Sequence, residues 1–279
     1  MRLGAPVFRW RNAEEWVLRH IEKGFGAAYW PLPVDASPAQ EQEFISAAKK
    51  HDLVIAEVGI WNNLLDPNAQ KQEENIRYAI ARLEQAERVG ARCCVNISGS
   101  LSTVWDGPHP QNMTEETFAR IVSITQRIID SVQPVRTRYT LEPMPWAYPS
   151  DLASTLRLIE AIDRPGLGVH VDMCNMMSGC DRIYRSGELT RGYFAALGGM
   201  IRSVHAKDVL LTDELTAHII EVIPGEGVFD HAELLRQCAQ LEDVCVMAEH
   251  LRSEAEYDRA TDFLRMTAEK QGFVWTRAR

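Results

Sequence analysis

Four acidic or histidine residues, each at the end of a short apolar run, are the residues of this sequence whose types and spacing could do chemistry together. They are Glu142 in YTLEPMPW, Asp172 in LGVHVDMCN, His205 in IRSVHAKD and Glu249 in VCVMAEH. The intervals are 30 residues from 142 to 172, 33 from 172 to 205 and 44 from 205 to 249, close to the length of a strand, a helix and the return strand in a parallel α/β unit. We therefore expect four successive strands to deliver one side chain each to a common site.

Three carboxylates and one imidazole form a set of mixed oxygen and nitrogen donors. Such a set suits Mn²⁺, Mg²⁺, Co²⁺ or Zn²⁺, and we favour Mn²⁺. Any one of these residues alone would more often be an ordinary loop acid or a hydrogen-bonded core histidine. Because all four follow apolar strands in phase, the sequence predicts a metalloenzyme with one divalent ion.

The elements that must position these residues alternate between short β-rich runs and amphipathic helical stretches, which is typical of a parallel sheet covered by helices. Strands are expected at 3–8, 24–30, 52–61, 91–98, 137–144, 166–173, 201–209 and 244–251. Helices are expected at 69–90, 114–134, 150–163, 229–241 and 253–272, from their caps and terminal glycines. Eight strands predict an α/β fold of the (β/α)8 TIM-barrel type, with residues 1–279 as a single domain. Catalytic groups of such barrels lie at the C-terminal ends of strands, where all four residues fall.

The composition limits the partners of the protein. The 279 residues are 46% hydrophobic and carry a formal net charge of −9, so the chain can bury a large core. Nucleic acid and anionic membranes are not expected as partners, because their binders need a basic surface; a small neutral or cationic ligand fits better. No apolar run suits a signal peptide or a membrane span, and we expect a cytoplasmic protein.

The six cysteines form no CxxC pair or disulfide framework, so reduced thiols are expected. Cys174, two residues after Asp172, could reach a metal, but a soft thiolate is not needed beside three carboxylates.

At these motifs the chain resembles the xylose isomerase-like TIM barrels, a superfamily of sugar isomerases and epimerases that includes ketose 3-epimerases and inosose dehydratases. The resemblance rests on LEPMP, HVDMCN, HAKD and AEH, and on IPGEGVFDHAELLRQC, which is similar to the family's PGEG turn before its seventh helix. It implies that Glu142, Asp172, His205 and Glu249 bind one divalent metal. It also implies that the two glutamates exchange protons with the carbon next to the substrate carbonyl.

That chemistry is physically consistent with the residue types. A metal polarises the carbonyl and hydroxyl oxygens and stabilises the developing enediolate. A carboxylate on each side of the substrate can then remove and return the proton.

Three positions depart from the ketose 3-epimerase pattern, and each concerns substrate recognition. Asn175 stands where those enzymes have His, Tyr148 where they have Glu, and Leu211 where they have Arg. A simple free-ketose 3-epimerase is therefore not expected, and Asn175 becomes a candidate substrate contact. HAKD is more similar to the dehydratase-like branches, in which Lys207 would approach a substrate oxygen; the alternative is a salt bridge from Lys207 to Asp208 or a neighbouring acid.

Four tryptophans follow the second to fifth expected strands and could form an aromatic wall. They are Trp30, Trp61, Trp105 and Trp146. Such rings pack against the apolar face of a sugar or against an aglycone; alternatively, they seal the barrel rim or a subunit contact.

Four further polar residues are weaker candidates. His109, in a loop after the fourth strand, could act as an acid or base near neutral pH, or be a surface residue. His170 shares the inward face of Asp172 and could orient a metal ligand, or be a core histidine. Arg252 and, more weakly, Glu226 could hold sugar hydroxyls.

The leading interpretation is a divalent-metal isomerase or epimerase that acts on a keto sugar or related polyol by proton abstraction next to a carbonyl. The closest rival begins with the same step but ends in β-elimination, as in a dehydratase or a lyase acting on a 3-keto-glycoside. The missing epimerase recognition residues and the tryptophans favour this rival. A metal-dependent DNA-repair endonuclease is disfavoured because it needs more histidine ligands and a basic face. In a non-catalytic sugar-binding subunit, the two glutamates would serve only to hold metal. Under any of these interpretations, the protein could form a homo-oligomer with copies of itself.

Overall fold

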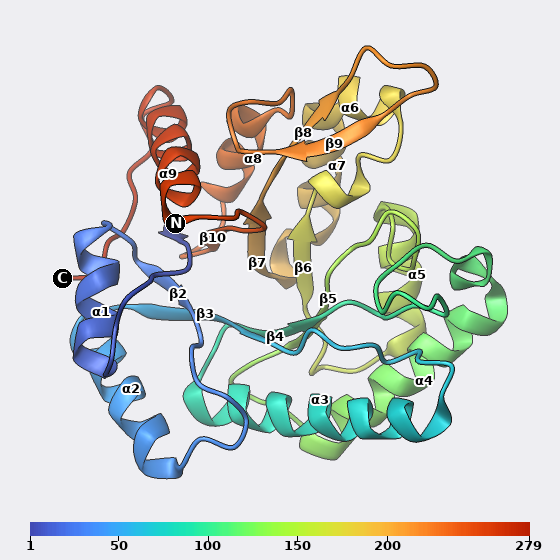
Figure 1. The fold of residues 1–279 in the computed structure, drawn as a ribbon, viewed down its shortest axis with the longest axis horizontal. Helices are drawn as coiled ribbons and strands as arrows, with labels where there is room; N and C mark the ends of the chain where they lie inside the picture. Colours follow the sequence, from blue (N-terminus) through green and yellow to red (C-terminus); the bar gives the residue numbers. More distant parts are fainter.

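Eight parallel strands with helices between them form a nearly closed barrel in the computed structural model, which describes residues 1–279 (Figure 1). The strands are β1 (Arg2–Gly4), β2 (Ala27–Tyr29), β3 (Val54–Gly59), β4 (Cys93–Asn96), β5 (Tyr139–Leu141), β6 (Val169–Asp172), β7 (Ile201–Ala206) and β10 (Cys245–Ala248). Their order around the barrel is β5-β4-β3-β2-β1-β10-β7-β6. A single bridge between Tyr139 and Leu167 joins the two ends. The predicted barrel is confirmed, although the first strand ends before Pro6, which has no N–H to donate to a neighbouring strand.

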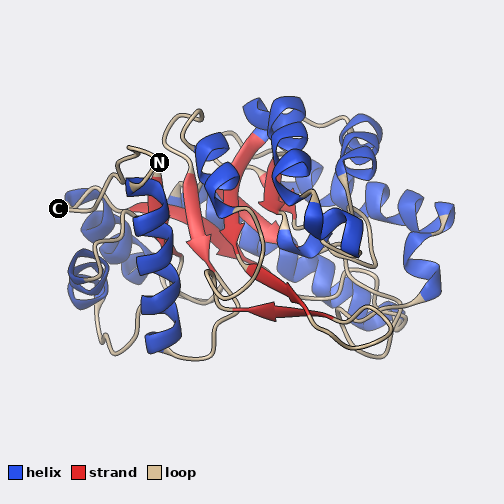
Figure 2. Cartoon of the chain, turned by 90° about the horizontal axis from the view of Figure 1, so that it is seen from above, coloured by secondary structure: helices blue, strands red, loops and turns tan.

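Helices surround the strands on the outside of the barrel (Figure 2). They are α1 (Ala13–Glu22), α2 (Pro38–Lys50), α3 (Ala69–Val89), α4 (Glu115–Val132), α5 (Leu152–Ile162), α6 (Cys180–Tyr184), α7 (Ser186–Leu197), α8 (His231–Cys238) and α9 (Glu254–Glu269), with short 3-10 turns η1 (Pro110–Met113), η2 (Cys174–Met176) and η3 (Gly198–Met200). The five predicted helices are present within a few residues. None of the helices combines the length and the apolar character needed to cross a membrane.

The helix ends are set by local sequence. Ser37 accepts a hydrogen bond from the Gln40 backbone N–H in a capping box at the start of α2, and the Ser253 side chain caps α9 by accepting a hydrogen bond from the Glu256 backbone N–H. Gly90 ends α3 in the left-handed conformation, with φ of 73°. These caps orient the helices so that their apolar faces cover the barrel.

An antiparallel hairpin, β8 (Asp208–Leu211) with β9 (Ile219–Val222), extends from the C-terminal end of β7. The sequence predicted one strand over 201–209, but the structure divides this run at Lys207. Asp208 begins the hairpin, and its carboxylate accepts hydrogen bonds from the N–H groups of Gly225, Gly227 and Phe229 at 2.9–3.1 Å. This carboxylate therefore fixes the PGEG turn against the base of the hairpin.

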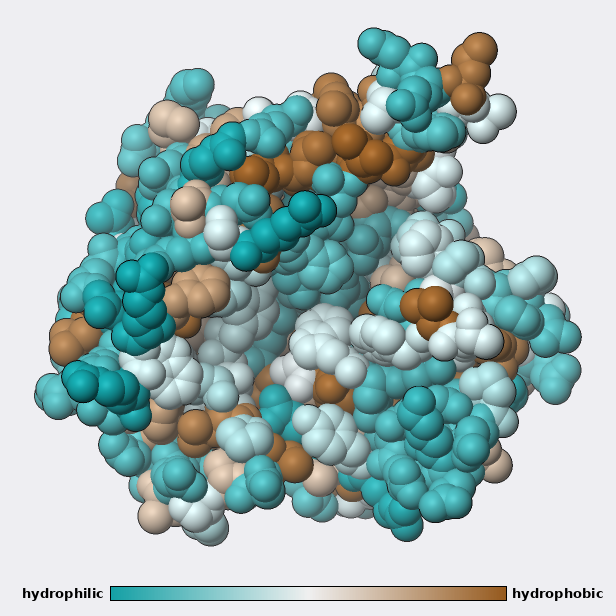
Figure 3. Space-filling model, viewed as in Figure 1, coloured by the Kyte–Doolittle hydropathy of each residue, from teal (hydrophilic) through white to brown (hydrophobic).

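The apolar core lies mainly between the barrel and its helices, in two large clusters of buried side chains. Inside the barrel, a third and smaller cluster of buried apolar side chains joins Ala27, Ala56, Cys245 and Met247, with Tyr29 and Val54 packed against it. Buried polar residues occupy the rest of the interior toward the C-terminal ends of the strands. In Figure 3 the molecule is hollowed near its middle, below the β8–β9 hairpin, and hydrophilic residues lie at the floor of the hollow.

Candidate metal and catalytic site

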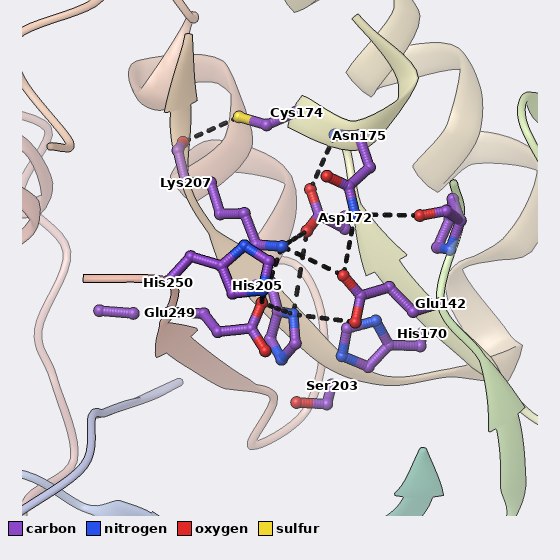
Figure 4. Close-up of polar contacts among 12 residues, drawn as sticks. Glu142, His170, Asp172, Cys174, Asn175, Ser203, His205, Lys207, Glu249 and His250 are labelled. Atoms are coloured by element: carbon purple, nitrogen blue, oxygen red, sulfur yellow. Dashed lines mark hydrogen bonds and ion pairs between the residues drawn. The ribbon is translucent and has the colours of Figure 1, made fainter. Parts of the chain in front are cut away.

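The C-terminal ends of four adjacent strands bring the four predicted ligands together (Figure 4). Glu142 follows β5, Asp172 ends β6, His205 lies near the end of β7 and Glu249 follows β10. One ligand atom from each residue lies within 4.8 Å of the others. Glu249 is the most accessible of the four, with 14% of its side chain exposed. The spacing in the sequence thus corresponds to one group of side chains in space.

The donor atoms of this group fit a divalent cation. Glu142 Oε2, Asp172 Oδ2, His205 Nδ1 and Glu249 Oε2 are all buried, and none of them makes a hydrogen bond. Buried polar atoms that make no hydrogen bond are unfavourable, and here four such atoms converge, one from each residue. A cation bound by three oxygens and one imidazole nitrogen would satisfy all four.

Lys207 places a second positive charge in the same group. Its buried ammonium lies 2.7 Å from Glu249 Oε2, 2.8 Å from Asp172 Oδ2 and 3.2 Å from Glu142 Oε1. Only the contact with Glu142 has the direction of a hydrogen bond, so the other two are ion pairs that leave their oxygens available to a metal. The expected salt bridge is thus formed with these three carboxylates rather than with Asp208. One ammonium and one divalent ion would together neutralise the three carboxylates.

The charges in the group shift one another's pKa values. Burial would raise the pKa of Glu142, but Lys207 and His205 lower it to about 2. For His205, burial lowers the pKa, and the neighbouring carboxylates, Glu249 first, raise it well above its ordinary value. The same carboxylates overcome burial to raise the pKa of Lys207. Without a cation, protons on these two residues supply the positive charge that the carboxylates require.

Glu57, in the middle of β3, contacts His205 at Nε2, the ring nitrogen that does not face the other predicted ligands. This buried carboxylate lies 3.1 Å from His205 Nε2 and 3.3 Å from His170 Nε2, and it also accepts a hydrogen bond from the Ser203 hydroxyl. Burial would raise the pKa of Glu57, but His205 and His170 lower it. An ionised carboxylate only accepts hydrogen bonds, so His205 carries a hydrogen on Nε2 and directs Nδ1 toward the other three ligands.

Glu57 and Ser203 were not predicted from the sequence. The available signal was Glu57 itself, the only acid in the apolar run LVIAEVGI. His170, which was predicted to orient a ligand, stands edge-on to His205 with the ring centres 4.1 Å apart, and its contact with Glu57 links it to the same network.

Asn175 and Cys174 lie beside the group in η2. The Asn175 amide donates hydrogen bonds to Glu142 Oε1 at 2.9 Å and to the Pro143 carbonyl at 3.0 Å, and its backbone N–H donates to Asp172 Oδ1. Asn175 therefore holds two of the predicted ligands in place. Cys174 instead donates its thiol hydrogen to the Lys207 carbonyl, and its sulfur is outside the converging group.

The four predicted tryptophans occupy two different environments. Trp61 is 40% exposed, and its ring centre lies 6.4 Å from that of His205. Trp105 and Trp146 are also partly exposed, and Trp146 Nε1 donates to the Asp106 carbonyl next to Trp105. The structure does not bring Trp30 to this rim, because it is buried in the core against Phe44.

The remaining candidates lie away from the converging atoms. His109 accepts a hydrogen bond from the Gln111 backbone and caps η1. Glu226 pairs with Arg259 of α9, and Arg252 is exposed in the loop after β10. His250, which was not predicted, is closer: its Nε2 lies 3.7 Å from Glu249 Oε2, and its Nδ1 lies 3.3 Å from Glu221 of β9. The hydrogen bond that His250 donates to the Glu221 carboxylate raises the pKa of His250.

Solved structures with the same fold include proteins of different activities. The chain is 16% identical to 3-keto-D-glucoside 4-epimerase from E. coli, with a TM-score of 0.68 over 95% of this chain and 99% of that one. It is 16% identical to the probable 3-DHS dehydratase from Bacillus anthracis, with a TM-score of 0.69 over 97% and 98%. Endonuclease IV from Thermus thermophilus gives 15% identity and a TM-score of 0.73 over 97% and 100%. At these identities the likeness establishes the fold alone.

The family follows from a separate comparison. No curated protein sequence matches the chain at a significant level. The sequence profile of the xylose isomerase-like TIM barrels, however, matches residues 18–267. This range contains seven of the eight barrel strands, all but β1. This chain belongs to the xylose isomerase-like TIM barrel family.

Proposed function

We propose that the protein is a divalent-metal-dependent isomerase or epimerase that moves a proton at the carbon next to the carbonyl of a keto sugar or related polyol. The observation that carries this proposal is the convergence of four buried donor atoms that make no hydrogen bond, two of them from glutamates. Mn²⁺ is the ion we favour, with Mg²⁺, Co²⁺ and Zn²⁺ as alternatives.

The arrangement of strands supports a role for both glutamates. Around the barrel, β10, β7, β6 and β5 follow one another, so Glu249 and Glu142 are the outer members of the group and Asp172 and His205 lie between them. When bound by these four residues, the metal would supply polarisation of the substrate carbonyl. A substrate held over the group then has one carboxylate near each side, and one glutamate can remove a proton that the other returns.

Glu142 and Glu249 make different contacts, and from these we infer different roles in the proton transfer. Glu142 Oε1 accepts hydrogen bonds from Asn175 and Lys207. Glu249 accepts no such hydrogen bonds, and it is the more exposed of the two, with 14% of its side chain accessible against 3% for Glu142. We therefore assign the initial proton abstraction to Glu249. Lys207 and His205 keep its carboxylate ionised, which is the form that accepts a proton.

Lys207 and Trp61 are the proposed substrate contacts. The Lys207 ammonium can donate a hydrogen bond to the oxygen on which negative charge develops, at a buried position where such a bond is strong. Trp61 can cover the apolar face of a sugar ring next to His205 and exclude water. A small carbohydrate also fits the net charge of −9 better than the nucleic acid implied by the endonuclease's name.

Solvent exchange tests this function. Metal-loaded protein is incubated in D₂O with ketoses, inososes and 3-keto-glycosides, and deuterium is followed by NMR. We expect incorporation at the carbon next to the carbonyl together with a new isomer. Glu249→Gln should lose this exchange even at metal concentrations that saturate its weakened site, and Glu226→Gln, at a surface ion pair, is the matched control. No exchange with any substrate class would refute the proposal.

Elimination is the second candidate, and His250 is the observation that favours it. This residue lies at the rim next to Glu249 and, with its raised pKa, can hold a proton for a departing oxygen. If the protein is a dehydratase or a lyase for 3-keto-glycosides, the same incubations will release an unsaturated sugar or an aglycone. His250→Gln should then slow release of the leaving group more than it slows deuterium exchange. Exchange without any release would exclude elimination.

A further inference from the structure

A second cavity, of about 490 Å³, lies at the opposite end of the barrel from the metal-ligand group. Arg92 precedes β4, Arg138 precedes β5 and Arg202 is the second residue of β7, so three arginines meet at the N-terminal ends of the strands. Arg136 and the exposed backbone of Gly199 complete this side of the cavity. The site is distinct from the catalytic group because Glu142 and His205 lie at the other ends of β5 and β7.

Two of these guanidinium groups have no carboxylate partner. Arg138 donates hydrogen bonds only through Nη1, to the carbonyls of Val135 and Thr137 at 2.9 and 2.7 Å. Arg202 likewise uses only Nη1, for the carbonyls of Gly199 and Ile201 at 3.2 and 3.0 Å. The Nε and Nη2 donors of both side chains are therefore free. A guanidinium offers five N–H donors in a fork that matches an oxyanion.

The acidic side chains that line the cavity do not neutralise the positive charge of its arginines. Asp243 is shared between Arg92, at 2.7 Å, and Arg2, also at 2.7 Å. Arg136 uses its Nη1 to cap the end of α3 through the carbonyls of Glu87 and Arg88. The cavity lining thus holds four arginines against two acids, Asp243 and Glu242, in a chain whose net charge is −9.

The side chains of Arg138 and Arg202 both start next to the backbone of Gly168. A side chain at Gly168, which precedes β6, would place its Cβ 2.9 Å from both Arg138 Cβ and Arg202 Cγ. The two arginine stems therefore flank Gly168 closely. Burial lowers the pKa of Arg202, and the positive charges of Arg138 and Arg92 lower it further, as expected of cations that lack a counterion.

We propose that this cavity binds a small molecule carrying a doubly charged oxyanion, namely phosphate or a phosphate monoester, between Arg138 and Arg202. Paired guanidinium groups bind phosphate oxygens by parallel, charge-assisted hydrogen bonds. The cavity volume lies in the range of small-molecule sites, so it can hold a phosphorylated metabolite as well as free phosphate. Binding at the N-terminal end leaves the catalytic end of the barrel open to substrate.

Calorimetry and thermal unfolding test this site. The whole protein is titrated with inorganic phosphate, with glycerol 3-phosphate and with glucose 6-phosphate, at constant ionic strength and against chloride. We expect saturable binding that raises the Tm, as for any ligand specific to the folded state. Arg138→Gln and Arg202→Gln should each weaken it by about tenfold or more, because each removes charged hydrogen bonds. Arg127→Gln, which removes an exposed arginine paired with Glu73, should leave binding unchanged.

A second variant keeps the test independent of folding defects. Nothing lies within 4 Å of a Cβ at Gly199, so Gly199→Asp adds a carboxylate at the cavity edge without a clash. This variant should remain folded and lose phosphate binding, since it supplies its own anion beside Arg202. Tighter binding of an ester than of inorganic phosphate would identify a phosphorylated metabolite, and equal binding would identify free phosphate. An effect that chloride reproduces, or that survives all three substitutions, would overturn the proposal.

Discussion

Replacement of Glu57 by glutamine should weaken metal binding although Glu57 is not one of the converging ligands. Glu57 accepts hydrogen bonds from His205, His170 and Ser203 at a fully buried position. Glutamine has the same shape but only one acceptor oxygen. If its NH₂ group faces His205, the imidazole hydrogen must move to Nδ1, which is the atom that would bind the metal. The substitution therefore changes the tautomer of His205 with little change in packing.

The expected size of this effect follows from the role of the hydrogen bond. Loss of an outer partner of a metal-binding histidine typically weakens metal affinity about 10- to 100-fold, which corresponds to about 1.4–2.8 kcal/mol. Ser203→Ala is the matched control, because it removes one hydrogen bond to Glu57 but leaves the bond to His205 intact. Its effect on metal affinity should be clearly smaller.

Titration with Co²⁺ measures this effect without any knowledge of the substrate. The visible absorption of bound Co²⁺ reports its ligands, and competition with a chelator gives the dissociation constant. Glu57→Gln should show both a weaker affinity and an altered spectrum. If its affinity and spectrum match those of the unmodified protein, Glu57 does not orient His205 and the argument fails.

Three further predictions concern the charge balance and the PGEG turn. Lys207→Met leaves three buried carboxylates without their ammonium, so urea unfolding should show a loss of about 3–5 kcal/mol in the metal-free protein, much of it restored by Mn²⁺; equal losses with and without Mn²⁺ would contradict this. Because the pKa of His205 is raised in the metal-free protein, its Nδ1 must release a proton when metal binds, so the affinity should fall by about tenfold per pH unit below that pKa; calorimetry in buffers of different ionisation enthalpy should detect the released proton, and its absence would show that His205 binds metal without deprotonation. Gly227→Ala places a Cβ 2.3 Å from Asp208 Oδ1 and 2.4 Å from the Val209 carbonyl, and should destabilise the fold by about 1–3 kcal/mol, whereas Gly192→Ala, with open space around it, should not destabilise it in the same denaturation assay.

The barrel and the convergence of the four predicted ligands were accessible to sequence reasoning because both depend on regular spacing. Each of these four residues is a polar residue at the end of an apolar strand, and the C-terminal ends of parallel strands meet at one end of a barrel. Glu57 has the same polar character but lies inside its strand, and its partners His170 and His205 are 113 and 148 residues away. Strand alternation could place Glu57 in the barrel interior, but only the assembled fold shows what it contacts.

The tryptophans show the limit of such reasoning in loops. Trp30 and Trp61 both follow strands, and the sequence treats them alike. The structure buries Trp30 against α2 through Phe44, while Trp61 adopts a left-handed backbone with φ of 53° and lies near His205. A positive φ at a bulky residue is uncommon and depends on the surrounding packing. Its ring direction therefore could not be predicted from its position after a strand.

In the segment from His205 to Asp208, the direction of each side chain determines which residues it contacts. His205 near the end of β7 and Lys207, the residue between β7 and β8, both enter the barrel, where one can offer a lone pair and the other a positive charge. Asp208 points away from them and binds the backbone of the PGEG turn. This difference in direction explains why Lys207 pairs with carboxylates on three other strands rather than with its sequence neighbour. Since its single charge leaves the three carboxylates two charges short of neutrality, a divalent ion bound here would complete the balance, whereas a monovalent ion would leave one buried negative charge uncompensated.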